Sequence, residues 1–223
     1  MTGDRVARLS LGIGRLLCAV AVAVCMVARY LRASPWVGPV DFLGYLTIQS
    51  NIAFVVVAVS AGVIALRSGL DHPRLDVARA TVLSLVLTAG ILFALILQQS
   101  GARGIRVDLP LSDVLLHFIL PVFALADWIL SPRRHRVSFR VLLAIVGFPV
   151  VWGILTMIRG SIVGWYPYYF LDPAQIDSAL EFAGLAVFML AVFAIVGSLV
   201  VAAPSRRFAA TSPRTAPASP APE

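Results

Sequence analysis

The chain has 223 residues, of which 60% are hydrophobic and 13% are charged, whereas ordinary soluble domains are roughly half apolar and a quarter charged. A soluble fold could not bury this much apolar surface, so the composition excludes a globular cytosolic protein. All 18 basic residues are Arg, as in proteins of GC-rich bacterial genomes, and they cluster between apolar blocks. The net charge of +7 therefore indicates anionic lipid headgroups as partners and requires no nucleic acid.

Six apolar blocks follow one another along the chain, and each is roughly 20 residues long, enough to span a membrane as a helix. We therefore predict an all-α fold, a polytopic bundle of six transmembrane helices over residues 1–203. The tail, residues 204–223, is rich in Pro, Ala, Ser and Thr and is expected to be disordered. The predicted spans are residues 10–30, 43–66, 80–98, 111–130, 138–158 and 178–202.

Arginine concentrates on the cytoplasmic side of membrane proteins, so its distribution predicts which way the helices run. With the N-terminus inside, the cytoplasmic segments hold 12 arginines and the outer segments hold 5, while Arg15 lies within the first span. We expect a multi-pass protein of the cell membrane with both termini in the cytoplasm.

A polar stripe opens the second span. Helical spacing places Thr47, Ser50 and Asn51 on one face, at i, i+3 and i+4. Such residues commonly hydrogen-bond to neighbouring helices or to their own backbone, which is the structural interpretation. In the functional interpretation the stripe lines a site, because hydrocarbon penalises an unpaired polar group by several kcal/mol.

The fourth span carries the only histidine within a predicted span. Asp113 and His117 share a face at i and i+4, and Pro121 leaves the His117 carbonyl without its helical donor, so we expect a bend there. An imidazole titrates near neutral pH, so His117 is either a proton acceptor or a packing residue. One histidine cannot supply both axial imidazoles of a haem, and no His/Cys cluster suggests zinc, so we expect no cofactor and no metal.

Thr47 and His117 lie at similar depths, because both helices run inward and both residues fall within the outer third of the membrane. A hydroxyl and an imidazole at matching depth could form a nucleophile and a base, with Asp113 orienting the ring. Matching depth does not establish contact, since two helices of a six-helix bundle need not be neighbours.

Aromatic residues and prolines are concentrated in residues 164–173, outside the fifth span. An interfacial aromatic belt accounts for most such runs. In the functional alternative, Trp165, Tyr166 and Tyr168 form the rim of a lipid-facing cavity.

Asp127 and Trp128 lie near the inner end of the fourth span, close in sequence to several arginines. We expect them to face Arg133 or Arg134 at the level of the lipid headgroups. Such contacts anchor a helix end, so we assign these residues a structural role.

Three stretches of the sequence resemble the androgen-induced-gene family of six-span membrane proteins, whose members hydrolyse fatty acid esters of hydroxy fatty acids with a threonine and a histidine. Together with the span count, the resemblance covers residues 45–202. The stretches are Tyr45-Leu46-Thr47, then His117 with Leu120-Pro121, then Trp165-Tyr166-Pro167 with Phe170-Leu171.

The resemblance implies an intramembrane hydrolase of lipid esters in which Thr47 is the nucleophile and His117 the base. Ser50 or Asn51 would then donate to the oxyanion. The chain departs from the animal members of the family at Ser50, where they carry an acidic residue, and the pair is more closely spaced here. The substrate would be a lipid-like molecule that arrives from the bilayer.

The competing hypothesis is a non-catalytic membrane protein, either a small transporter or a lipid-binding subunit, in which the same polar groups line a cavity. Transporters usually contain repeats or paired broken helices. The sequence has only Pro121 and Pro149 in consecutive spans and no clear repeat, which makes transport the weaker of these alternatives. The sequence does not predict an oligomeric state.

Overall fold

The computed structural model describes residues 2–67, 72–102, 108–131 and 134–204, and over these residues it is helical without strands. Six of the helical segments are long and apolar enough to cross a membrane, which confirms the predicted six-helix bundle. The predicted disordered tail lies outside the described residues except for Pro204. The spanning segments are α1 (Thr2–Ala33), α3 (Leu46–Arg67), α4 (Pro73–Ala102), α5 with η1 and α6 (Leu111–Val114, Leu115–Ile119 and Leu120–Leu130), α7 (Leu142–Val163) and α8 (Ala179–Ala202).

The described residues also contain three short helical segments. Helix α2 (Pro39–Gly44) precedes α3, η2 (Phe139–Val141) begins the fifth span before α7, and η3 (Tyr169–Leu171) lies in the loop before α8. We call residues 164–173 the aromatic loop. Within it, Tyr169 donates a hydrogen bond to Gln99 near the end of α4, at 3.3 Å. The loop therefore packs at the same end of the bundle as the C-terminal end of α4.

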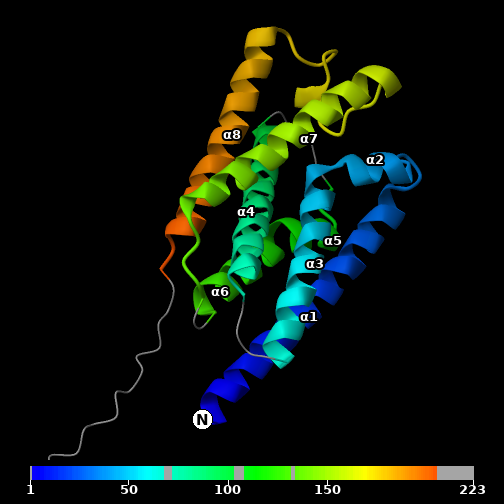
Figure 1. The fold of residues 1–223 in the computed structure, drawn as a ribbon. Coiled ribbons are helices and arrows are strands. Elements are labelled where there is room, and N and C mark those ends of the chain that lie inside the picture. The colour runs from blue at the N-terminus through cyan, green and yellow to red at the C-terminus, as the bar shows by residue number, and fades with distance from the viewer. Residues whose placement is uncertain (1, 68–71, 103–107, 132–133, 205–223) are drawn as a thin grey trace, which may run out of the picture.

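Helix α4 is the central element of the bundle. It packs against α3, α6, α7 and α8, while α1 packs mainly against α3 (Figure 1). This central position agrees with the sequence of α4, because a helix that is apolar around its whole circumference is usually buried. Ala80, Ser84 and Thr88 of α4 are indeed buried.

Where a bend was predicted in the fourth span, the helix contains a π-helical turn, η1, which ends two residues before Pro121. A π turn adds one residue to the helical repeat and commonly marks a functional site. The turn carries His117, whose carbonyl lies against Gly90 of α4, where a Cβ atom would lie 2.3 Å from the oxygen. Only glycine allows the two helices to approach so closely here.

Helices α7 and α8 meet at one end and separate toward the other. Near their contact, Gly197 of α8 lies directly against the side chains of Leu142 and Ile145 of α7. In Figure 1, α7 then runs obliquely away from α8, toward α2. Residues of both helices beyond the contact line a cavity.

Candidate functional site

A cavity of about 480 Å³ lies among the start of α3, α4, α7, the aromatic loop and α8. Its volume falls within the usual range for ligand sites, roughly 300–1,000 Å³. Its walls are largely aliphatic and aromatic, and we call it the Thr47 cavity. Representative lining residues from each element are Thr47, Phe93, Trp152, Tyr168 and Phe193.

Thr47 and Tyr168 form a polar end in this cavity. The Tyr168 phenol lies close to the Thr47 side chain and to the backbone of Leu46 and Thr47, in the first turn of α3. The first N–H groups of a helix have no partner within the helix, so a side chain that reaches them satisfies an otherwise unpaired donor. Burial raises the pKa of Tyr168, so the phenol stays protonated at neutral pH and can donate a hydrogen bond.

Ser50 and Asn51 are buried and use their side chains locally. The Ser50 hydroxyl donates to the Thr47 carbonyl at 2.9 Å, and Asn51 Nδ2 donates to the same carbonyl at 2.8 Å. These bonds hold the first turn of α3 and direct both donors toward the backbone. Asn51 Oδ1 has no hydrogen-bond partner among the described residues, although it is fully buried.

His117 lies behind one wall of the Thr47 cavity. Its ring stacks on Phe93 with a centroid distance of 3.8 Å and an interplanar angle of 15°, and Phe93 itself lines the cavity. His117 Nδ1 lies 3.0 Å from the Asp113 backbone oxygen. The described contacts include no hydrogen bond between His117 and Thr47.

The Asp113 carboxylate interacts with α1 and not with the imidazole. Its Oδ1 lies 2.8 Å from Arg29 Nε, while the Asp113 backbone carbonyl is the group that meets the ring. The structure thus brings Asp113 and His117 together through the backbone, and the carboxylate ties the start of the fourth span to the first.

The three predicted rim residues have different surroundings. Tyr168 lines the cavity and makes edge contacts with the rings of Tyr45 and Trp152, at 5.6 and 5.9 Å between centroids. Trp165 packs on Tyr45 and under the Arg159 guanidinium, at 5.7 and 5.5 Å.

The Tyr166 ring lies against the backbone of α7 at Gly160, where a Cβ atom would come within 2.5 Å of it. Tyr166 and Trp165 therefore hold the aromatic loop against α7 and against Tyr45, which precedes α3, while Tyr168 lines the cavity.

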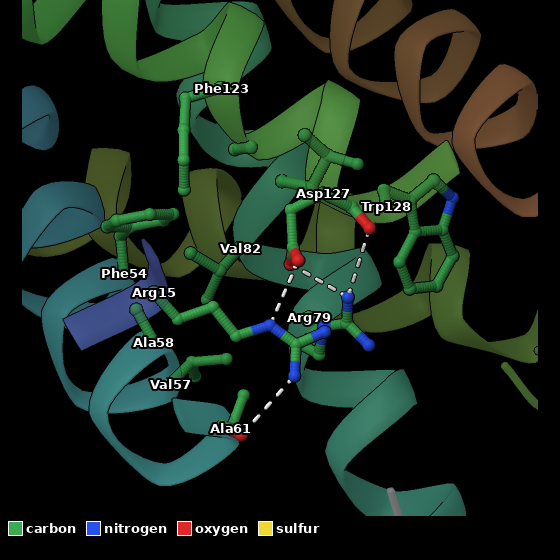
Figure 2. Close-up of a pocket in the computed structure, with 12 residues that line it drawn as sticks. Arg15, Phe54, Val57, Ala58, Ala61, Arg79, Val82, Phe123, Asp127 and Trp128 are labelled. Carbon is green, nitrogen blue, oxygen red and sulfur yellow. Dashed lines mark hydrogen bonds and ion pairs between the residues drawn. The ribbon is translucent and has the colours of Figure 1, made fainter. Parts of the chain in front are cut away.

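A buried cluster of charges lies at the opposite end of the bundle. Arg15 of α1 and Arg79 of α4 donate to the two carboxylate oxygens of Asp127 of α6, at 2.9 and 2.8 Å (Figure 2). The two arginines are only 4% and 6% exposed, so these charges are desolvated. Arg15 also donates to the Ala61 carbonyl of α3 at 3.2 Å. One carboxylate therefore joins four helices, directly or through Arg15.

The cluster continues to the loop that follows α6. Asp76 accepts hydrogen bonds from Arg79, at 3.2 Å, and from the His135 backbone, at 2.9 Å. Ser131 accepts from Arg15 at 2.8 Å. We call these residues the Asp127 cluster: Arg15, Asp76, Arg79, Asp127, Ser131 and His135.

Asp127 was predicted to face Arg133 or Arg134, and Arg133 lies outside the described residues. The Asp127 carboxylate pairs with Arg15 and Arg79, from distant parts of the chain. The prediction holds for Trp128, because the Arg134 guanidinium lies 3.7 Å from the centroid of its ring. Local sequence favoured the nearest arginines, whereas a charge buried in a helical bundle pairs with whichever helix packs against it.

Comparison of the chain with family models, curated proteins and solved structures found no match. The fold and site thus define a class: an all-helical, six-span architecture with an apolar cavity at one end and buried charges at the other. The resemblance to the androgen-induced-gene family stays a prediction.

Proposed function

We propose that the protein binds a long-chain lipid in the Thr47 cavity. The observation that carries this proposal is a largely apolar cavity of about 480 Å³ with two neighbouring hydroxyl residues, Thr47 and Tyr168. Relative to water, burying a hydrocarbon chain against such walls is favourable by about 0.8 kcal/mol per methylene. Thr47 and Tyr168 can hydrogen-bond to one end of such a molecule, and the apolar walls contact the rest.

The chemistry of the polar end favours a ligand that accepts hydrogen bonds. A protonated Tyr168 phenol and the Thr47 hydroxyl can each donate a hydrogen bond. A carboxylic acid, an ester or an amide presents the matching carbonyl oxygen. The proposed ligand is therefore an acyl lipid whose carbonyl group lies at Thr47 and Tyr168.

Two glycines of α7 give a matched test. Gly153 lines the cavity and Gly147 does not, and a Cβ atom at either position meets no atom within 4 Å. Gly153→Leu should therefore fill the cavity without disturbing the fold, while Gly147→Leu places the same side chain elsewhere on the same helix. We expect Gly153→Leu to weaken binding of a dansyl-labelled fatty acid at least tenfold and Gly147→Leu to leave it unchanged. Equal binding by both variants would overturn the proposal.

Hydrolysis of an acyl ester by Thr47 and His117 is a second proposal. It is supported by the Thr47 hydroxyl in the cavity and by the contact of His117 with Phe93, a residue of the same cavity wall. Proton transfer requires Phe93 to turn aside so that the imidazole reaches the hydroxyl, because a general base acts at hydrogen-bonding distance. The substrate would be an acyl ester from the bilayer.

Two nearly isosteric changes test the catalytic proposal. Thr47→Val removes the hydroxyl and His117→Gln removes the imidazole, so either change should abolish hydrolysis of a long-chain acyl ester and labelling by a fluorophosphonate probe. The double variant should be scarcely worse than either single one, since residues that act as a unit lose their rate together. Turnover that persists in Thr47→Val, at an unchanged melting temperature, leaves lipid binding as the function.

The arginine distribution supports a further proposal, that the protein lies in the cell membrane with both termini in the cytoplasm. Reporter fusions at residues 69 and 136 should then report the cytoplasm, and fusions at residues 102 and 165 the outside. An externally accessible residue 136 would contradict this orientation.

A further inference from the structure

We infer that Phe193, with Pro149 and Ala89, forms a closed end of the Thr47 cavity and sets the longest chain that the protein accepts. This inference rests on the proposed lipid-binding function and adds a chain-length limit to it. Lipids would then lie with the carbonyl group at Thr47 and Tyr168 and the end of the chain at Phe193.

The order of the lining residues along the helices defines the two ends. Toward the aromatic loop the lining begins at Ile96 of α4, Ile158 of α7 and Phe182 of α8. At the other extreme it stops at Ala89, Pro149 and Phe193, one residue from each of the same three helices. Phe182 and Phe193 are about 16 Å apart along α8 at 1.5 Å per residue.

The protein is densely packed beyond Phe193. Phe193 is 2% exposed and belongs to the main core, and one turn further along α8 Gly197 lies against Ile145 of α7, which is 0% exposed. This contact is where α7 and α8 meet, and a close-packed interior has no room for further methylenes. The cavity is therefore blind at Phe193, and its hydroxyls, Thr47 and Tyr168, come from the start of α3 and from the aromatic loop.

A blind cavity gives a characteristic dependence of affinity on chain length. For an acid that binds from water, each methylene buried against the walls raises affinity by about fourfold. The rise should stop when the chain reaches Phe193, because a longer chain must either bend or push its carbonyl group away from Tyr168. A cavity open at both ends, or binding to the lipid-facing surface of the bundle, gives a rise without a sharp limit.

The test measures displacement of a dansyl-labelled fatty acid from the purified protein by saturated acids from octanoic to eicosanoic. Phe193→Ala should move the limit to longer chains, and Gly153→Leu, which fills the cavity between its two ends, should move it to shorter ones. Phe193→Leu serves where the alanine variant does not fold, and Gly147→Leu is the matched control, with an unchanged limit.

The outcomes separate the two claims. If no acid displaces the probe from the wild-type protein, the proposed function itself fails. If the acids compete but show no chain-length limit, lipid binding stands and the inference about Phe193 is overturned. The same holds if the limit is unchanged both in the Phe193 variant and in Gly153→Leu. A limit that moves in opposite directions in the two kinds of variant supports the inference.

Discussion

The Asp127 cluster and the Thr47 cavity place polar groups in apolar surroundings in opposite ways. In the Asp127 cluster, each charged side chain meets a partner from another part of the chain, and the partners join α1, α3, α4 and α6. In the Thr47 cavity, two hydroxyl residues border a space of about 480 Å³ that the protein leaves unfilled.

The Asp127 cluster is suited to stabilising the fold, and the Thr47 cavity is suited to binding a ligand. Buried charges that are paired hold helices together, and removal of one partner is strongly destabilising. An apolar space is unfavourable for the protein alone, because its lining lacks the contacts of a close-packed core. The cavity is therefore the better candidate for function, and variants at the two ends should behave differently.

The largest effect is expected for Asp127→Asn. This change leaves Arg15 and Arg79 without their shared carboxylate while both stay buried, and breaking a buried pair costs about 3–5 kcal/mol. The melting temperature in detergent should fall sharply. The control is Asp41→Asn, which breaks the ion pair between Asp41 and Arg159. The Asp41 side chain is 28% exposed and the Arg159 side chain is 35% exposed.

A half-buried pair at this exposure is largely screened by solvent and contributes about 1 kcal/mol, so the control should melt much closer to the wild type than Asp127→Asn. Similar melting temperatures for Asp127→Asn and Asp41→Asn would contradict the contrast between the two ends.

A smaller loss of stability is expected for Gly90→Ala. The new methyl group would lie 2.3 Å from the His117 carbonyl oxygen, so α4 and the π turn must move apart. Overpacking of this kind costs about 1–3 kcal/mol. Gly147→Ala adds the same methyl group where no atom lies within 4 Å and should leave the melting temperature unchanged or slightly raised.

The smallest effect on stability, with a clear effect on binding, is expected for Tyr168→Phe. The change removes one hydroxyl from the polar end of the cavity, and a single hydrogen bond contributes about 0.5–1.5 kcal/mol, or roughly a twofold to tenfold change in affinity. Tyr169→Phe is the control, because its hydroxyl bonds to Gln99 and does not line the cavity. Unchanged affinity of Tyr168→Phe for the dansyl-labelled fatty acid would remove Tyr168 from the binding site.

The six spans were predictable from the sequence, because each is a continuous apolar run whose length alone makes it a candidate. The break in the fourth span was also predictable from Pro121, although its form as a π turn was not. Proline removes a hydrogen bond, but the packing of neighbouring helices decides how the backbone adapts.

Long-range contacts were beyond the reach of sequence reasoning. Arg15 had no assigned role, although a charge within a span requires a partner, and Asp127 was assigned instead to the arginines that follow it in the sequence. The role of Phe93, which separates the predicted base from the cavity, has no signal in the sequence, since one phenylalanine among many apolar residues is unremarkable. Thr47 and Tyr168 were both candidates, but their contact depends on how the aromatic loop folds over α3.

Photolabelling with a long-chain fatty acid that carries a diazirine near the end of its chain tests the central claim most directly. We expect the label on peptides that contain the cavity residues Met189 and Phe193, with labelling lost in Gly153→Leu and retained in Gly147→Leu. Labelling spread over exposed apolar residues such as Leu143, Ile162 and Val187, and equal in the two variants, would contradict a lipid site in the Thr47 cavity.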